Sequence, residues 1–251
     1  MKTITPLIVA VLVLLGAGFL IMNSDSEEDN AVDQSTDSDS ASQLIAINAG
    51  DIYRYDADGK IVGFKSSGGP RDNKLTRTDL SALATIDNVE SATAFSVIPG
   101  EVKTGDSLIE RTILAGVGSD FLSVLGFQID QGRFFSEDEV DRNVAFVGND
   151  VAELLGGEVS GQTLKINSRD FEILGSLNKI IISSTSGVDF NRLVLIPLEK
   201  AEEFWGEEFG IQEINIYAKD IESVPQIVED ARTHLLKTRT EDEFTIISST
   251  R

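Results

Sequence analysis

The first residues of this chain contain a charge-free run that decides which part of it can fold in water. Lys2 and the terminal amine carry the only early positive charges, and the run from Thr3 through Ser24 has no charged side chain. As a helix, Thr3 to Met22 would be about 30 Å long, which matches the hydrocarbon core of a bilayer. The sequence therefore predicts one membrane helix at residues 1–22 and a fold that lies outside the bilayer.

The alternative to a membrane anchor is a cleaved signal peptide, whose apolar region is shorter and ends at an A-x-A-like site. No such site lies between Ala10 and Ala31, and no cysteine follows the run, which excludes lipoprotein processing. We therefore favour an uncleaved, single-pass anchor in the cell membrane. Lys2 precedes the span and acids follow it, which predicts a cytoplasmic N-terminus and a periplasmic or extracellular bulk.

Residues 23–42 read NSDSEEDNAVDQSTDSDSAS and contain seven acids, no bases and almost no apolar side chain. Such a segment has too little apolar surface to bury to offset the loss of conformational entropy on folding. We predict an acidic, disordered linker at 23–42, followed by a globular part at 43–251.

Composition excludes several classes of function. The chain has 42 Asp plus Glu against 21 Lys plus Arg, a formal net charge of -21 that repels phosphate backbones, so nucleic acid is not an expected partner. It has no cysteine and only one histidine, His234, which excludes thiolate zinc sites, disulfides and clusters of histidine ligands. The run at 56–59 begins like a calcium loop, but Gly59 falls fourth instead of sixth, so a tight turn is favoured. No metal and no cofactor is expected.

Hydrophobic periodicity predicts an α+β fold. Alternating or short apolar runs predict strands at 43–48, 51–65 (a hairpin), 89–98, 110–117, 143–148, 162–177 (a hairpin), 192–197, 212–219 and 243–248. Helical spacing predicts helices at 78–86, 119–125, 149–157, 198–205 and 221–236. Thr78 is the expected cap of the first of these helices, Ser136 is expected to cap a further turn, and residues 99–106 are expected to form a loop with irregular strand.

A Gly-x-Gly at 116–118 suggests a phosphate-binding loop, but a dinucleotide fingerprint would need a third glycine where Phe121 stands. The stretch instead predicts a short helix that Ser119 caps and that Gly126 ends in a left-handed conformation. These glycines and aromatics are expected to serve turns and core.

Taken in order, these residues resemble the MacB-like periplasmic core domain of ABC-transporter permeases of the MacB, LolC and FtsX type. The first block of the family pattern is matched by Gly116, Asp120, Phe121, Gly126, Gly132, Arg133, Phe135 and Asp138. The second block is matched by Val144, Gly148, Gly156, Gly161, Gln162, Phe171, Ile173, Gly175, Asp189 and Pro197. Leu155 stands where the family often has Phe, and Ser176 where it usually has Val. The resemblance covers about residues 43–251.

The resemblance implies an architecture that periodicity alone does not give. Residues 43–116 and 207–251 would form a porter-like subdomain of sheet and helices, and residues 117–206 an inserted, mixed α/β, Sabre-like subdomain. The signature residues would then have structural roles, with no catalytic or cofactor-binding residue among them. In the family's permeases this domain lies between two membrane helices and carries ATP-driven motion to partners in the envelope.

The chain departs from such permeases in having no Walker motif and in ending at Arg251, where the family continues into a second membrane helix. A free-standing domain on its own anchor is therefore expected. An enzyme is not expected, because His234 lies in a helical pattern without an accompanying G-x-S-x-G. Phe204 and Trp205 are expected to anchor a helix to the sheet.

These inferences converge on a membrane-anchored, extracytoplasmic, non-catalytic module of an ABC export or envelope-remodelling system. Its expected partners are the membrane, through the N-terminal helix, and an ABC permease, an ATPase or another envelope protein. Two alternatives remain open: a solitary extracellular ligand- or peptide-binding protein, and a truncated ABC permease. A binding protein should have a formed pocket with converging polar groups, and an accessory module an exposed apolar surface.

Overall fold

The computed structural model describes residues 43–51, 53–55, 61–64, 74–180, 189–206 and 209–248. The membrane helix expected at 1–22 and the linker expected at 23–42 lie outside these ranges, as does the turn expected at 56–59. Within them, no helix is both long enough and apolar enough to cross a membrane.

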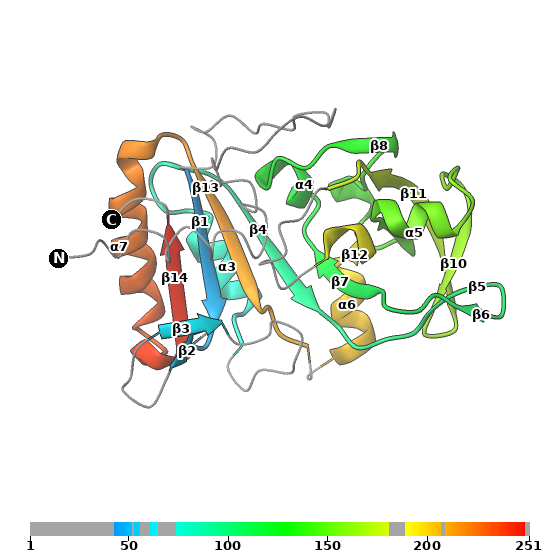
Figure 1. The fold of residues 1–251 in the computed structure, drawn as a ribbon. Coiled ribbons are helices and arrows are strands. Elements are labelled where there is room, and N and C mark those ends of the chain that lie inside the picture. Colours follow the sequence, from blue (N-terminus) through cyan, green and yellow to red (C-terminus); the bar gives the residue numbers. More distant parts are fainter. Residues whose placement is uncertain are drawn as a thin grey trace.

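One mixed sheet runs through the described part of the molecule. Its strand order is β14-β1-β13-β4-β7-β12-β9-β11-β10-β5-β6, and β8 pairs with β11 off this path. A separate hairpin is formed by β2 (Tyr53–Tyr55) and β3 (Ile61–Phe64). Helices and strands are thus combined in a mixed α+β fold, which confirms the predicted class (Figure 1).

The terminal part of the sheet brings together the two ends of the described chain. It comprises the antiparallel strands β14 (Phe244–Ser248), β1 (Leu44–Ala49), β13 (Glu213–Ala218) and β4 (Val89–Val97), with the helices α3 (Arg77–Leu83) and α7 (Val224–Leu235) and the short turns η4 (Ile221–Ser223) and η5 (Glu241–Glu243). Ile45 and Ile47 alternate with residues on the opposite face, so both point into the cluster beneath the helices. Helix α7 buries Val224, Ile227, Ala231 and Leu235 in that cluster, one residue every three or four.

The middle part of the sheet is built from the intervening residues. Its strands are β5 (Val102–Thr104), β6 (Ser107–Leu108), β7 (Ile113–Val117), β8 (Ile129–Gly132), β9 (Val144–Val147), β10 (Thr163–Ile166), β11 (Arg169–Leu177) and β12 (Leu193–Pro197). Its helical segments are α4 (Phe121–Val124), η1 (Glu137–Glu139), α5 (Asn149–Leu154) and η2 (Phe190–Arg192). The pairs β7–β12 and β9–β11 are parallel, and β9 and β12 are buried along their whole length, as parallel strands covered on both faces are.

A short ladder joins the two parts. Strand β4 pairs with β7 antiparallel at three positions, Phe95↔Val117, Ser96↔Gly116 and Val97↔Ala115. Helix α6 (Leu198–Trp205) covers one face of this junction, and α4 covers the other, where Phe121 stacks on Phe95 with ring centroids 5.7 Å apart.

Two predicted helix caps were wrong. Helix α3 is capped by Thr76 instead of Thr78, because the Thr76 side chain and Asp79 form a reciprocal capping box. Helix α4 begins after Asp120 without a side-chain cap, because the Ser119 hydroxyl donates to Glu137 at 2.7 Å. The end of α4 was predicted correctly: Gly126 has a φ of +70°. The turn predicted at Ser136 is also confirmed, as η1.

The segment at 99–106, expected to be loop with irregular strand, forms the first strand and the turn of a regular hairpin. Strands β5 and β6 pair with each other, and β5 pairs with β10, where Lys103 lies opposite Lys165. This hairpin falls within residues 43–116 of the sequence and extends the sheet of the middle part. Its strands are too short and too polar for a hydrophobic pattern to reveal them.

The close contact between β8 and β11 depends on Gly132 and can be tested by substitution. Gly132 and Gly161 both have left-handed backbones, with φ of +66° and +81°. A Cβ on Gly132 would collide with the Leu174 carbonyl oxygen, whereas a Cβ on Gly161 would meet nothing within 4 Å.

We therefore expect Gly161→Ala to lower the free energy of unfolding by about 1–2 kcal/mol, the cost of the backbone conformation. Gly132→Ala should cost about 1–3 kcal/mol more, because the close approach of the strands is also lost. Urea unfolding of the two purified full-length variants, followed by circular dichroism, measures the difference. Equal unfolding midpoints would contradict the described packing of β8 on β11.

Candidate functional site

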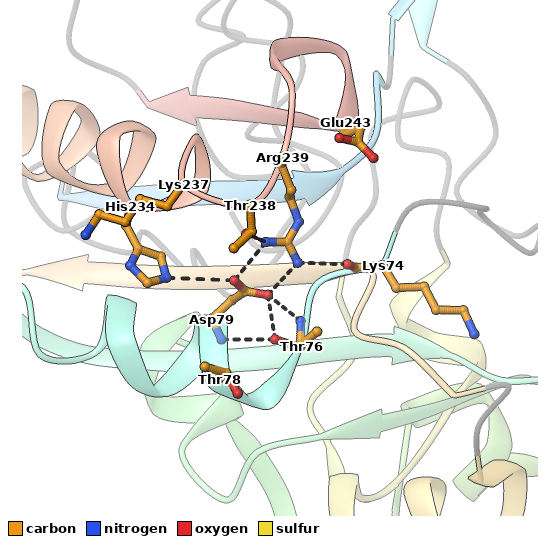
Figure 2. A pocket seen from close by; sticks show the side chains of 9 residues that line it. All are labelled: Lys74, Thr76, Thr78, Asp79, His234, Lys237, Thr238, Arg239 and Glu243. Atoms are coloured by element: carbon orange, nitrogen blue, oxygen red, sulfur yellow. Dashed lines mark hydrogen bonds and ion pairs between the residues drawn. The ribbon is translucent and has the colours of Figure 1, made fainter.

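A surface pocket of about 580 Å³ lies where α3 begins and α7 ends. Its lining residues are Lys74, Thr76, Thr78, Asp79, His234, Lys237, Thr238, Arg239 and Glu243. Figure 2 shows that Asp79 lies at the centre of this group, with Thr76 below it, Arg239 above it and His234 to one side. The pocket combines charged and hydroxyl side chains from two segments that are far apart in the sequence, 74–79 and 234–243.

The sequence Thr-Arg-Thr-Asp at 76–79 builds the floor of the pocket. The Thr76 backbone N–H and hydroxyl each donate to Asp79 Oδ2 at 2.7 Å, and the Asp79 N–H donates back to the Thr76 hydroxyl at 3.2 Å. Three donors of the first turn of α3 are satisfied in this way. Asp79 is only 4% exposed, so its carboxylate needs further partners.

Arg239, which follows α7, supplies those partners. Its Nη1 and Nη2 donate to Asp79 Oδ1 and Oδ2 at 2.9 and 2.6 Å, a bidentate pair, and Nη2 also donates to the Lys74 carbonyl at 3.1 Å. Burial opposes ionisation of Asp79, but the hydrogen bonds from Thr76 and Arg239 outweigh it and hold the pKa of Asp79 below its ordinary value.

His234 lies in the last turn of α7, with a side chain that is 28% exposed. Its Nε2 is 3.8 Å from Asp79 Oδ1, which is too long for a hydrogen bond, so Asp79 does not orient the ring as it would in a catalytic pair. Both Asp79 oxygens already accept strong hydrogen bonds. The arrangement therefore serves to fasten the start of α3 to the chain after α7.

No group of three or more His, Asp or Glu side chains is placed to hold a metal ion within the ranges that the structure describes. The aromatic pair Phe204 and Trp205 is not among the residues that line the pocket. Phe204 packs edge-on against Phe171 and Trp205, with centroids 5.7 and 5.4 Å apart, and so joins the end of α6 to β11.

The signature residues lie outside the pocket, in the middle part and at its junction. A Cβ would overlap a neighbouring atom at four of the signature glycines, which are Gly116, Gly132, Gly148 and Gly175. Gly126, Gly132 and Gly161 have positive φ angles. The signature aromatics Phe121, Phe135 and Phe171 are buried, and Pro197 ends β12 directly before α6.

The charged signature residues have three different environments. Arg133 donates to both oxygens of Glu139, at 2.5 and 2.8 Å, and these hydrogen bonds lower the pKa of Glu139 to about 2. Asp138 is exposed in η1. Burial raises the pKa of Asp120, which precedes α4.

Of the pocket residues, only Thr78 and His234 are singled out by the sequence, and neither is recognised there as part of a pocket. The Thr76 to Asp79 spacing is a capping-box pattern and could have been recognised. The partner could not have been, because Arg239 lies 160 residues away in the sequence from Asp79.

This pair generates a prediction for stability and its pH dependence. Arg239→Gln leaves a buried carboxylate without its cation, which should lower the free energy of unfolding by about 3 kcal/mol at neutral pH. Because the pKa of Asp79 is lowered, its ionised form contributes stability that is fully present above about pH 4 and is lost as the pH falls through the folded-state pKa. The deficit of Arg239→Gln should therefore shrink in acid, where a protonated Asp79 needs no cation.

The control is Arg232→Gln, which breaks the more exposed pair with Glu241 and should cost less than about 1 kcal/mol. Denaturant unfolding of both variants across the acidic range provides the measurement. An Arg239→Gln deficit no larger than that of the control at neutral pH would show that the buried pair does not fasten α3 to α7.

The sequence of this chain matches a known protein family, whereas the pocket alone identifies none. A model of the MacB-like periplasmic core domain matches residues 7–234. The macrolide export ATP-binding/permease protein MacB 2 of Aeromonas hydrophila is 26% identical over 180 residues, 69% of this chain and 27% of that protein. The corresponding MacB protein of Shewanella oneidensis is 31% identical over 80 residues, 32% of this chain and 12% of that protein. This chain thus spans about a quarter or less of the length of these relatives.

Solved structures agree on the fold. The periplasmic region of MacB from Actinobacillus actinomycetemcomitans superposes with a TM-score of 0.67 at 18% identity, covering 83% of this chain and 90% of that one. The extracellular domain of the noncanonic ABC-type transporter YknZ from Gram-positive bacteria gives 0.60 at 14% identity, covering 82% and 100%. Because the family model matches well over half of the sequence and the fold agrees, the chain belongs to the MacB-like periplasmic core domain family.

Proposed function

We propose that this chain is a membrane-anchored, extracytoplasmic, non-catalytic domain that works as an accessory or interaction module of an ABC export or envelope-remodelling system. Family membership supports the link to ABC transporters, and the two curated relatives are named as macrolide export ATP-binding/permease proteins. For this chain, an ABC permease or ATPase is the proposed partner, and macrolides are not assigned as its substrate.

The proposed arrangement follows the chain from the membrane outward. Residues 1–22 anchor it with a cytoplasmic N-terminus, and residues 23–42 form the acidic linker. The porter-like subdomain comprises 43–116 and 207–251, and the Sabre-like insertion comprises 117–206. The hairpin β5–β6 extends the sheet of the middle part although it precedes residue 117 in the sequence.

The observation that carries the proposal is the position of the two ends of the described chain. Strands β1 and β14 are antiparallel neighbours, and Ile45 lies opposite Ser248. The chain therefore enters β1 and leaves β14 at the same end of the sheet, as the terminal part in Figure 1 shows. A domain tethered at that end would leave its middle part free to reach a partner.

Exposed apolar side chains occur in this middle part. Leu154 on α5 is 60% exposed, Leu108 on β6 is 51% exposed and Ile129 on β8 is 40% exposed. Large apolar side chains in water contribute to binding when a partner buries them. By contrast, the central polar groups of the pocket bond to one another, which favours an interaction module over a solitary ligand-binding protein.

Site-specific photo-crosslinking tests this proposal in membranes that contain the full-length chain. A photoreactive residue at Leu154, in the middle part, should capture an ABC permease or bring down its ATPase. One at Leu236, which is 42% exposed in the terminal part, serves as the matched control and should capture less of either. Mass spectrometry of the purified adducts identifies the partners.

The protein must first be shown to be abundant in the membrane fraction. If neither position then captures a transporter component above the level of a sample without irradiation, the accessory role is wrong. The solitary binding protein would become the leading alternative.

A further inference from the structure

The terminal and middle parts are joined by a short ladder, so other contacts must fix the angle between them. The β4–β7 ladder contains three residue pairs, a small fraction of the sheet. Strand pairs twist and bend readily when they are short. Contacts on the two faces of the junction therefore decide how rigidly the parts are held.

Helix α6 contributes to the cores of both parts. Leu198, in its first turn, is buried in the cluster beneath α3 and α7, and Ala201, one turn later, is buried in the cluster of the middle part. The helix lies very close to β7, since a Cβ on Gly116 would be 2.5 Å from Ala201 Cβ. Moving α6 away from one part would therefore also disturb its contacts with the other part.

Ion pairs fasten α6 to each part. On one side Arg77, at the start of α3, lies 2.8 Å from Glu199 and 2.5 Å from Glu202. On the other side Arg169 of β11 lies 2.9 Å from Glu203, and its guanidinium carbon is 4.2 Å from the centroid of the Phe204 ring. The three glutamates are within one turn and a half of the same helix, so α6 is held between two arginines from different parts.

Arg77 is held rigidly enough to act as such a fastening. It directly follows the cap residue Thr76, and the start of α3 is fixed by the Asp79–Arg239 pair. The side chains of Arg77, Glu199 and Glu202 are 38%, 29% and 40% exposed, respectively. These pairs can therefore break without opening either apolar core.

The opposite face of the junction is held differently. There α4 packs on β4 through the stacked rings of Phe121 and Phe95, within one apolar cluster that also contains Leu44 and Ile247 of the terminal part. These apolar contacts have no directional bonds and tolerate small rotations better than paired charges do.

We propose that α6 is an ionic latch, closed by Arg77, that sets the angle between the terminal and middle parts. With the Arg77 pairs made, the parts keep the observed angle. With the pairs broken, the parts rotate by a small angle about the β4–β7 ladder, without opening the apolar clusters that cross the junction. This device depends on the contacts of α6 alone and does not require the proposed role in transport.

The test uses the absence of cysteine from the natural sequence. Spin labels at Glu229→Cys on α7 and Glu153→Cys on α5, both exposed, report the distance between the two parts of the full-length chain by pulsed electron resonance. The parent pair should give one narrow distance population at low salt. Arg77→Gln should shift the population or broaden it.

Arg133→Gln is the matched control, because it breaks the Arg133–Glu139 pair within the middle part, and it should leave the distribution unchanged. Raising the salt concentration from about 0.01 to 1 M, which shortens the screening length from about 30 to 3 Å, should broaden the parent distribution toward that of Arg77→Gln. If Arg77→Gln impairs folding, the double variant Glu199→Gln/Glu202→Gln removes the same pairs from the helix side.

Circular dichroism of each labelled variant establishes that it is folded. A folded Arg77→Gln or double-glutamine variant with the narrow parent distribution would overturn the latch. A change of equal size in Arg133→Gln would also overturn it, since the effect would then not be specific to α6.

Discussion

The close approach of α6 to β7 is the constraint on which the two-part arrangement depends. Gly116 leaves no Cβ between the strand and Ala201, so the helix can lie directly over the ladder that joins β4 to β7. From that position α6 places Leu198 in one core and Ala201 in the other. A larger residue at 116 would separate the helix from the strand and weaken both contacts at once.

The terminal and middle parts are stabilised by different kinds of interaction. The terminal part fastens its helices through a buried charge, Asp79, whose oxygens are satisfied by a cap and by a bidentate arginine. The middle part depends on tight turns and buried aromatics, which explains why its glycines and phenylalanines are so regularly placed. The chain's formal charge of -21 is compatible with both, because most acids in the described ranges lie at the surface. Of the three buried acids there, Asp79, Glu139 and Glu213, the first two form ion pairs with arginines.

Sequence reasoning found the elements that have a strong local signal. Strands such as β1 and β12 are apolar runs of the right length, and Gly126 ends its helix as a left-handed glycine does. It failed where a competing local bond decides the outcome, as when Thr76 rather than Thr78 captures the first turn of α3. It also missed the β5–β6 hairpin, which is held by β10 rather than by its own pattern. The Asp79–Arg239 pair and the Arg77 pairs are long-range contacts, which no local pattern contains.

We propose that an N-terminal segment anchors this family member to the cytoplasmic membrane and that its globular part lies outside the cytoplasm. Because the natural chain has no cysteine, single cysteines can be labelled with a membrane-impermeant maleimide in cells whose cytoplasmic membrane is intact. We expect Glu229→Cys, exposed on α7, to be labelled in such cells, and Lys2→Cys to be labelled only after the membrane is disrupted. Labelling of Lys2→Cys in intact cells, or protection of Glu229→Cys until lysis, would contradict the account.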